Sequence, residues 1–236
     1  MNKLENKVLI LTGASKGIGK VTSKKLIEYK PNLVLVSRKM SDLDKLKSEL
    51  KYDNVIFIEA DVSKEEDCNK IVNEAAKKFG TIDVLINNAA QFARGNVADL
   101  KLEDFDRVLA TNIRGVFILT KLVLPFMFKQ NRGTIVNISS TAGKRGYPGG
   151  AAYVISKFAL NGFSECLFKE VREHNIRVIT VSPSMVDTRE KPLEEHKETG
   201  KGVYMRAEDV ADSIINSILL PQRTLVKDIE LWGTNP

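Results

Sequence analysis

Short apolar runs alternate with longer amphipathic stretches along the whole chain. Six of the runs are rich in Val, Ile and Leu and read as strands: Lys7–Thr12, Asn32–Ser37, Asn54–Glu59, Ile82–Ile86, Thr134–Ser139 and Ile176–Val181. Their apolar residues are continuous rather than alternating, which is typical of parallel strands covered on both faces. A weaker seventh strand is expected at Leu225–Leu231.

The stretches between the apolar runs have helical spacing. This spacing predicts helices over about 17–29, 41–51, 64–79, 103–130, 151–174 and 207–219. Ser63 and Glu66 have the spacing of a capping box for the third helix, and Gly80 is expected to end it. Strands and helices alternate without a linker, so the pattern predicts one α/β domain over residues 1–236. We expect a doubly wound parallel sheet of about seven strands with helices on both faces.

The least regular segment covers residues 187–203. It is charged, it contains Pro192, Gly200 and Gly202, and it follows the sixth strand, at the edge where such sheets bind ligands. We interpret it as a lid over a binding site, because binding segments favour loops at this edge. A plain surface loop is the alternative.

Composition excludes several classes of protein. The chain is 43% hydrophobic and 28% charged, which argues against intrinsic disorder. The longest apolar stretch, Gly115–Phe128, is too short to cross a bilayer and is broken by Lys121 and Pro125. The amino terminus lacks the long apolar run of a signal peptide. Cys68 and Cys166 cannot form a disulfide framework, so we expect a cytoplasmic protein.

The net charge of +6 is concentrated in the first fifth of the chain. Residues 1–50 hold 11 of the 36 Lys and Arg residues but only 5 of the 30 Asp and Glu residues. A solvated lysine-rich helix face is the simplest interpretation. A binding site for a polyanion is the sharper one, with a phosphorylated cofactor or a nucleic acid as candidates. No basic stripe interleaved with aromatic residues and no nucleic-acid motif occurs, which disfavours nucleic acid.

The first predicted strand runs into a glycine-rich turn that is followed by a helix. Its glycines, Gly13, Gly17 and Gly19, have the pattern GxxxGxG, which fits neither the phosphate-binding loop of nucleotide triphosphatases nor the common GxGxxG pattern. The physical roles survive this change of spacing: a tight turn, a close approach of the backbone to a pyrophosphate, and a helix packed close to the sheet. The N–H groups at the helix start then favour an anion. A turn without a ligand is the alternative.

The end of the second strand indicates which dinucleotide would bind. Sites for NAD usually place an acidic residue there, whereas this chain has Ser37, Arg38 and Lys39. An arginine can pair with the additional phosphate of NADP, and Lys16 in the glycine turn can reach the same group. Together with the local charge excess, this favours NADP(H) over NAD(H), although exposed surface cations would give the same sequence.

Tyr153 and Lys157 lie four residues apart at the start of a predicted helix, on one face. A tyrosine with a pKa near about 10 is a poor base at neutral pH. A nearby ammonium group stabilises the phenolate and lowers that pKa, so the phenol can donate or accept a proton. Because this chain is rich in lysine and has five tyrosines, the same spacing can also arise by chance.

Further motifs occur in a fixed order around this pair. The glycine turn opens the first strand, Asn87-Asn88-Ala89-Ala90 follows the fourth, and Ser139-Ser140 ends the fifth, ahead of Tyr153 and Lys157. In this combination the chain resembles the classical short-chain dehydrogenase/reductase family, in its NADP-preferring type, over essentially its full length. The resemblance implies a Rossmann-type fold and an oxidoreductase that acts on CH–OH or C=O groups.

The resemblance also implies catalytic roles. Tyr153 would be the proton donor and acceptor, and Ser140 would polarise the substrate carbonyl. Lys157 would hold the nicotinamide ribose and tune Tyr153. Asn112, in Thr111-Asn112-Ile113, matches the asparagine that supports a proton-relay water. Ser139 is expected to be only a neighbour of the catalytic serine.

Cofactor and substrate contacts follow from the same resemblance. The residues expected to bind NADP(H) are Gly13, Ser15, Lys16, Gly17, Ile18, Gly19, Ser37, Arg38, Lys39, Asp61, Val62, Asn88, Ala89, Tyr153, Lys157, Pro183, Val186 and Thr188. The residues expected to line the substrate pocket are Gln91, Phe92, Arg94, Tyr147, Gly150 and Met185. Arg94 receives an anion or simply points to solvent. No metal site is expected.

Two positions depart from the family pattern. Ala90 stands where the family often has the glycine of Asn-Asn-Ala-Gly, and Ser184 stands where it often has glycine after Pro183. Neither change removes a catalytic group, but the side chain of Ser184 narrows the space expected beside the nicotinamide.

The sequence supports a leading function and several alternatives. The leading one is an NADPH-dependent carbonyl reductase, reversible as an alcohol dehydrogenase, with small molecules as substrates. A 3-oxoacyl-(acyl-carrier-protein) reductase is the alternative on substrate, because Lys129 and Arg132 can face an acidic carrier. A non-catalytic NADP-binding regulator is the alternative of another class. A nucleic-acid binder is more distant, and no membrane partner is expected.

The long helix near the middle of the chain points to self-association. It has more apolar residues than one sheet-facing stripe needs: Val116, Phe117, Leu119, Leu122, Val123, Phe126 and Phe128. Surplus apolar surface must be buried somewhere. The resemblance implies that this helix and the one after Tyr153 form subunit contacts, so we expect a homotetramer, or otherwise a homodimer.

Overall fold

The computed structural model describes residues 3–190, 198–200 and 202–235 of the chain. Seven parallel strands form the central sheet in the order β3-β2-β1-β4-β5-β6-β9. Their bounds are Val8–Thr12 (β1), Asn32–Ser37 (β2), Val55–Glu59 (β3), Val84–Asn87 (β4), Gly133–Ile138 (β5), Ile176–Pro183 (β6) and Asp228–Leu231 (β9). This confirms the predicted doubly wound α/β domain, including its weaker seventh strand.

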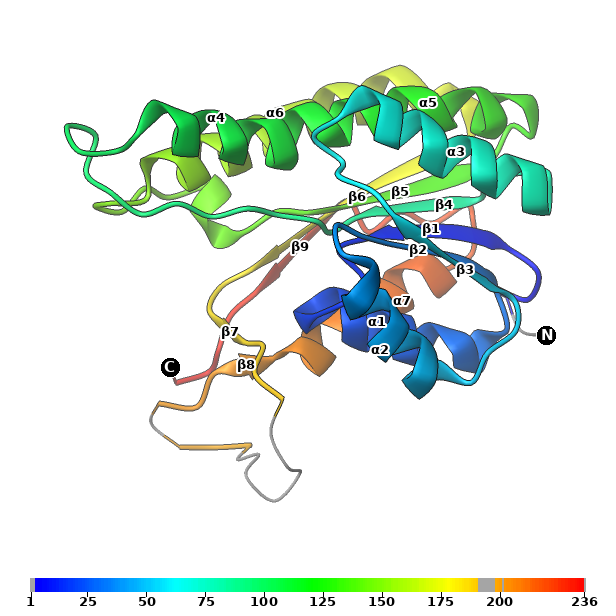
Figure 1. The fold of residues 1–236 in the computed structure, drawn as a ribbon, viewed down its shortest axis with the longest axis horizontal. Coiled ribbons are helices and arrows are strands. Elements are labelled where there is room, and N and C mark those ends of the chain that lie inside the picture. The colour runs from blue at the N-terminus through cyan, green and yellow to red at the C-terminus, as the bar shows by residue number, and fades with distance from the viewer. Residues whose placement is uncertain (1–2, 191–197, 201, 236) are drawn as a thin grey trace.

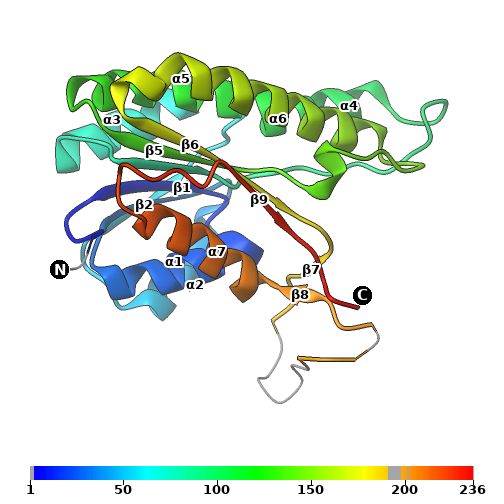
Figure 2. The same ribbon diagram turned by 180° about the vertical axis from the view of Figure 1, so that it is seen from behind.

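Helices cover both faces of the sheet, as Figures 1 and 2 show from opposite sides. One layer holds α1 (Gly17–Leu26) with the short η1 (Ile27–Tyr29), α2 (Met40–Leu50) and α7 (Ala207–Leu219). The other holds α3 (Glu65–Phe79), α4 (Leu102–Leu109), the π turn η2 (Ala110–Arg114), α5 (Gly115–Lys129) and α6 (Ala151–Val171). The short η3 (Thr141–Gly143) and η4 (Arg172–His174) flank α6.

Two apolar clusters lie on the two faces of the sheet. Every residue of β1 is buried, and successive residues of this strand belong to alternate clusters. Val8 and Ile10 pack with α3 and α5, whereas Leu9 and Leu11 pack with α1 and α7. Successive side chains of a strand point to opposite faces, so a strand that serves both layers must be apolar throughout. This explains the continuous apolar runs of the sequence.

The strand order reverses between β1 and β4, which are neighbours in the sheet. Connections from β1 and β4 therefore leave toward opposite faces, and a crevice opens at the carboxyl ends of these strands. Ligands bind at this point in doubly wound sheets. The glycine turn, the segment after β4 and the end of β6 all lie at this edge of the sheet.

The third helix begins differently from the prediction. Its N-cap is Lys64, without a side-chain cap, so the predicted capping box of Ser63 and Glu66 is wrong. Ser63 instead donates its N–H and hydroxyl to Asp61 Oδ1, at 3.0 and 2.8 Å, and Asp67 Oδ2 accepts the N–H of Asp61 at 2.7 Å. Asp61 competes for the serine because it is nearer in sequence. Gly80 ends the helix in the left-handed region, as predicted.

The segment after β6 is described only in part. It contains the two-stranded sheet of β7 (Val186–Asp187) and β8 (Met205–Arg206). The centre of the predicted lid, residues 191–197, and residue 201 lie outside the described residues. Whether this segment closes over a site therefore stays a prediction.

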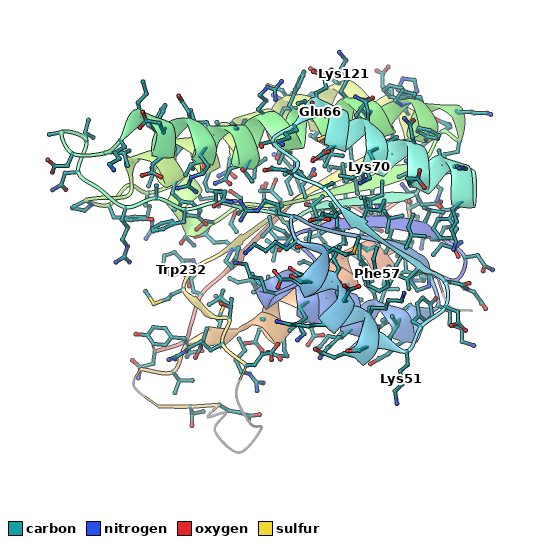
Figure 3. All side chains as sticks on the ribbon, viewed as in Figure 1. Lys51, Phe57, Glu66, Lys70, Lys121 and Trp232 are labelled. Atoms are coloured by element: carbon teal, nitrogen blue, oxygen red, sulfur yellow. The ribbon has the colours of Figure 1, made fainter. Side chains whose placement is uncertain are left out.

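The chain from Leu102 to Lys129 forms one long helical run through α4, η2 and α5. By length and composition this run alone, among the described residues, could cross a membrane. Half of its most apolar window is buried inside the structure, as it is in core helices that never meet a lipid. Figure 3 places Lys121 on the outer side of this layer, away from the sheet. The run is thus accounted for as a covering helix of the sheet.

Candidate active site

The glycine turn leaves β1 at the switch in strand order. Gly17 has a φ of +53°, and a side chain there would meet Thr188 at 3.4 Å. A Cβ on Gly19 would lie 2.1 Å from the carbonyl oxygen of Gly13, so only glycine allows α1 to start this close to β1. Ile18 turns the other way and packs against the core. The turn therefore presents backbone, not side chains, to the edge where a ligand would lie.

The segment after β4 supports this turn. Asn88 Nδ2 donates to the carbonyl oxygens of Thr12 and Gly13, at 2.9 and 3.1 Å. The Thr12 hydroxyl accepts the N–H groups of Asn88 and Ala89, both at 3.0 Å. The Asn88 side chain is thus bound to the backbone of the glycine turn, and four hydrogen bonds hold the two segments together.

Cations without a carboxylate partner gather at the end of β2. Ser15 Oγ and Ser37 Oγ are 2.8 Å apart, which brings the glycine turn and this strand end together. Lys16, Arg38 and Lys39 are exposed around them, and no ion pair holds any of the three among the described residues. By contrast, Lys20 on the next turn of α1 pairs with Glu49 and Glu190. The free cations form an electropositive site at the carboxyl edge.

Asp61 and Val62 follow β3 at the same edge. The side chain of Asp61 accepts from Ser63, and Val62 is buried against α5, where a Cβ on Gly115 would lie 2.4 Å from the Val62 carbonyl oxygen. These residues and the end of β2 flank the same stretch of the sheet edge. Contact of Asp61 and Val62 with an adenine ring stays a prediction.

Tyr153 and Ser140 face each other across the site. Burial raises the pKa of Tyr153 above its ordinary value, and a hydrogen bond with Ser140 offsets part of this rise. Ser140 Oγ accepts the N–H of Ala142 at 3.1 Å and lies 3.4 Å from the carbonyl oxygen of Pro183, which fixes the hydroxyl at the end of β5. The two hydroxyl groups can therefore hold one oxygen atom between them.

Lys157 lies one helical turn from Tyr153 on α6 and is buried. Its Nζ donates to the carbonyl oxygen of Ile138 at 2.7 Å and lies 5.5 Å from the centre of the Tyr153 ring. Burial lowers the pKa of Lys157 to about 8. The expectation that the ammonium group would lower the pKa of Tyr153 is not met: burial raises this pKa, and the group that offsets part of the rise is Ser140.

Asn112 lies on the π turn between α4 and α5 and is buried. Its Oδ1 accepts the N–H of Gln91 at 2.7 Å, and its Nδ2 donates to the Gln91 carbonyl oxygen at 2.9 Å and to Ser156 Oγ at 3.0 Å. Both amide N–H groups are therefore engaged within the protein. The side chain clamps the segment after β4 to α6, next to Lys157.

The predicted substrate residues come from two segments that touch. Gly95 N–H donates to the carbonyl oxygen of Gly149 at 3.2 Å. Phe92 meets Tyr153 edge to face at 5.2 Å between ring centres, and the Arg94 guanidinium lies 5.7 Å from the Phe92 ring. A Cβ on Gly150 would collide with the Tyr147 ring, so the glycine lets this ring fold back toward α6.

The remaining predicted residues lie on β6 and after it. Pro183 ends β6 beside Ser140, Val186 is in β7, and Thr188 lies next to Gly17. Met185 is 63% exposed, so the structure does not bury it with the other predicted substrate residues. Ser139, as expected of a neighbour only, turns away to bind Asn161 Oδ1 at 2.6 Å.

A cavity beside the glycine turn is not the catalytic centre. It measures about 700 Å³ and lies between α1 and the segment after β7, where Lys20, Thr188 and Arg206 line it. Ser140, Tyr153 and Lys157 are not among its lining residues. These three groups, and not this cavity, mark the position of the candidate active site.

Two features of the site were missed by sequence reasoning. Ser156, which binds Asn112, has no motif of its own and reads as an ordinary helix residue. The π turn that presents Asn112 interrupts a segment that reads as one continuous helix. Such turns often mark functional sites, but their sequences do not distinguish them from α-helix.

The residues present fit a phosphorylated dinucleotide. The glycine turn offers a backbone cradle that side chains would fill, free cations lie at the end of β2, and polar groups that handle protons lie beyond β5. Along the sheet edge, the cations at the end of β2, the glycine turn and the groups beyond β5 follow one another. The adenosine phosphate, the pyrophosphate and the nicotinamide of a bound dinucleotide would lie in the same order.

Comparisons with known proteins agree with this arrangement. The family model for short chain dehydrogenases matches residues 7–199. The NADP-dependent 3-hydroxy acid dehydrogenase of Schizosaccharomyces pombe is 33% identical over 240 residues, covering 97% of this chain and 93% of that protein. A 3-oxoacyl-[acyl-carrier-protein] reductase of Thermotoga maritima is 34% identical over 225 residues, covering 90% of each.

A solved structure is similar over nearly the full length. A metagenomic short-chain oxidoreductase in complex with NADP superposes with a TM-score of 0.86 at 27% identity, covering 99% of each chain. Family match, relatives and fold agree, so this chain belongs to the short-chain dehydrogenase/reductase family, whose members are oxidoreductases of CH–OH and C=O groups.

Proposed function

We propose that the protein is an NADPH-dependent carbonyl reductase, reversible as an alcohol dehydrogenase. The observation that carries the proposal is the cluster of Ser140, Tyr153 and Lys157 at the carboxyl edge of the sheet. Two hydroxyl groups converge there beside a buried amine, an arrangement that suits proton transfer to one oxygen atom. A protein that only senses the dinucleotide has no chemical need for this cluster, which disfavours a non-catalytic regulator.

Tyr153 and Ser140 have separate tasks in this mechanism. NADPH, when bound, supplies the hydride. Because burial raises its pKa, Tyr153 is protonated at neutral pH and can donate its proton to the carbonyl oxygen. Ser140, held by Ala142 and Pro183, donates a hydrogen bond to the same oxygen and stabilises the negative charge that develops on it. In the reverse direction, the phenolate accepts the proton of an alcohol.

Lys157 and Asn112 position these groups. Lys157 would hold the nicotinamide ribose and, as an ammonium group, stabilise the phenolate once the proton has left. Asn112 fixes the segment of Gln91 against α6, so the wall of the site keeps its distance from Tyr153. Asn112 would also support a proton-relay water, as the family resemblance implies.

The choice of NADP(H) over NAD(H) is supported by charge. Arg38 and Lys16 are exposed, have no carboxylate partner among the described residues, and flank Ser37 at the adenosine end of the edge. A 2′-phosphate would neutralise them. The match to an NADP-dependent relative and to an NADP-bound structure points in the same direction.

A 3-oxoacyl-(acyl-carrier-protein) reductase is the alternative on substrate. Lys129 and Arg132 are exposed at the end of α5 and can face an acidic carrier, and a relative with this activity matches 90% of the chain. We further propose a cytoplasmic, homo-oligomeric enzyme that acts on small molecules and binds neither nucleic acid nor membrane.

The test is the substitution Tyr153→Phe. The phenyl ring keeps its edge contact with Phe92 and loses only the transferable proton, so turnover of a good carbonyl substrate should fall about 10²- to 10⁴-fold. NADPH affinity, measured by fluorescence titration, should stay near that of wild type. Tyr29→Phe, which removes a phenol hydroxyl on η1, is the control and should leave both unchanged. Reduction by the Tyr153 variant at the wild-type rate would remove Tyr153 from the mechanism.

A further inference from the structure

Several cations on the segments that border the substrate side of the active site are paired with carboxylates. Lys144 pairs with Glu230, Arg107 with Asp104 and Arg189 with Asp187. Arg145 stacks on Trp232 and also lowers the pKa of Glu230. Arg94 has no carboxylate partner among the described residues, and it lies near the rings of Phe92 and Tyr147. No carboxylate of the described residues therefore compensates the positive charge of Arg94.

Arg94 lies on a segment that is fixed at both ends. Asn112 holds the backbone N–H and carbonyl of Gln91, and Gly149 accepts the N–H of Gly95. Between them, Ala93 is buried in a small apolar cluster with Val108 and Ala152. A side chain on such a segment starts from a defined position, as binding groups do when they are placed on rigid parts of a fold.

The guanidinium of Arg94 lies near an aromatic ring that contacts Tyr153. It lies 5.7 Å from the Phe92 ring, and that ring lies 5.2 Å from the ring of Tyr153. On the other side, its charge acts on Tyr147 and lowers the pKa of that phenol, against the larger upward effect of burial. Two contacts in series thus link Arg94 to the proton donor, a separation that an oxo acid of several carbon atoms can span.

This environment suits one kind of ligand group. A guanidinium group presents a planar pair of N–H donors that matches the two oxygens of a carboxylate. Stacking on an aromatic ring orients the plane and leaves its N–H edge free. A neutral ester or thioester at the same place would leave the positive charge uncompensated.

We propose that Arg94 determines substrate specificity by binding the carboxylate of an oxo acid, which the enzyme reduces to the hydroxy acid. The inference rests on the proposed carbonyl reductase function. The carbonyl carbon gains the hydride of NADPH, its oxygen gains the proton of Tyr153, and the carboxylate remains unchanged. In this substrate the anionic end lies against Phe92 and Arg94, and the carbonyl end lies between Ser140 and Tyr153.

The experiment compares matched substrates and variants. Reduction of 3-oxobutanoate, 4-oxopentanoate and 5-oxohexanoate is measured against that of their methyl esters, with wild type, Arg94→Gln and Arg94→Lys. Loss of a charge-assisted hydrogen bond should lower kcat/KM for the best acid about 10- to 100-fold in Arg94→Gln and leave its ester nearly unchanged. Arg94→Lys keeps the charge without the paired donors and should fall between. Arg145→Gln is the control, because Arg145 already faces Glu230, and it should preserve the ratio of acid to ester.

A binding measurement separates this inference from the proposed function. NADPH-loaded enzyme cannot oxidise an alcohol, so 4-hydroxypentanoate forms a non-reacting complex whose affinity is read by calorimetry, with pentan-2-ol as the neutral comparison. Arg94→Gln should remove the preference for the acid. Equal rates for acids and esters in wild type, or equal losses for both in Arg94→Gln, would overturn the role of Arg94 while leaving the reductase intact. Binding that depends on Arg94 without turnover of any carbonyl compound would reject the reductase and keep the anion site; neither binding nor turnover would reject both.

Discussion

Burial shifts the pKa values of Lys157 and Tyr153 away from their ordinary values. The amine is nearly inaccessible and binds only a carbonyl oxygen, so its pKa falls to about 8, while that of the phenol rises. Both shifts favour the neutral form of the group, as desolvation must. Each group has one polar partner, the carbonyl oxygen of Ile138 for the amine and Ser140 for the phenol, and these partners do not cancel the effect of burial.

This burial makes folding stability depend on pH in a defined direction. The pKa of Lys157 is 10.5 in the unfolded chain and about 8 in the folded one. Between these values the unfolded chain binds a proton that the folded chain does not, so the free energy of unfolding rises with pH across this window. In urea unfolding without cofactor, wild type should gain about 2–3 kcal/mol relative to Lys157→Met between pH 7 and pH 10.

The comparison with the variant is essential, because other groups titrate in the same range. Burial raises the pKa of the Cys68 thiol to about 12. The free energy of unfolding therefore falls as pH rises above 9, because the thiol ionises first in the unfolded chain. That effect is common to wild type and Lys157→Met and cancels in their difference. A difference that stays constant from pH 7 to pH 10 would mean that the amine is solvated in the folded chain.

We propose that side chains at the end of β2 determine the choice of cofactor. Ser37→Asp combined with Arg38→Leu removes a cation and places a carboxylate where the 2′-phosphate would lie. We expect NADPH affinity to fall about ten- to a hundredfold, because a charge-assisted contact contributes roughly 1.5–3 kcal/mol. Affinity for NADH should be unchanged or better, because the new carboxylate can accept from the ribose diol.

Fluorescence titration of both cofactors checks this expectation. Lys45→Leu, which removes an exposed cation from α2 in the same basic region, is the control and should leave the preference unchanged. A wild type that prefers NADH, or a double variant whose preference does not move, would make Arg38 a surface charge and leave the basic excess of residues 1–50 without this cause.

Element by element, the sequence was informative where one periodicity dominates. The predicted α7 and β2 have the bounds of the structure. The predicted helices 17–29 and 151–174 match α1 with η1 and α6 with η4, because α1 and α6 themselves end three residues earlier. The other elements differ by one or two residues at an end, apart from the seventh strand, which starts at Asp228 instead of Leu225. Errors arose where local side-chain bonds or backbone geometry decide. The start of α3 depends on which carboxylate Ser63 meets, and the π turn at Ala110–Arg114 depends on the packing of Asn112 against Gln91 and Ser156.

The candidate site shows the same division. Motifs in order located Gly13, Ser140, Tyr153 and Lys157, because each type of residue has a chemical reason to stand at its strand end or helix start. Contacts between segments were beyond reach: nothing in the sequence places Phe92 against Tyr153 or assigns Ser156 to Asn112. The direction of the Tyr153 pKa also required the structure, because burial competes with charge and only three-dimensional packing gives the degree of burial.

At the scale of the whole molecule, the layer of α5 and α6 carries apolar surface that the sheet does not cover. Of the surplus residues predicted on the long helix, Val116, Leu119 and Val123 belong to the core, and Leu122 and Phe126 are partly buried. The other two surplus residues, Phe117 and Phe128, are exposed. Further exposed apolar residues of this layer are Leu102 at the start of α4 and Ile155 and Phe158 on α6. Phe117 reaches across to Phe163 of α6 at 6.0 Å between ring centres, so part of this surface is continuous.

A second copy of the chain would cover such a surface, and we predict a homotetramer, or otherwise a homodimer, that associates through α5 and α6. Phe117 and Phe158 are 52% and 47% exposed, and large exposed aromatic residues are characteristic of interfaces. Light scattering at micromolar concentration should give a multiple of the 26.3 kDa chain mass for wild type.

The double substitution Phe117→Ser with Phe158→Ser should shift the measured mass toward that of the monomer, because interface aromatics that pack centrally contribute about 2 kcal/mol or more each. Val97→Ser removes an apolar residue that is 81% exposed on the loop before α4 and should leave the mass unchanged. A monomeric wild type would contradict the prediction, and an oligomer that survives the double substitution would place the interface on another face of the molecule.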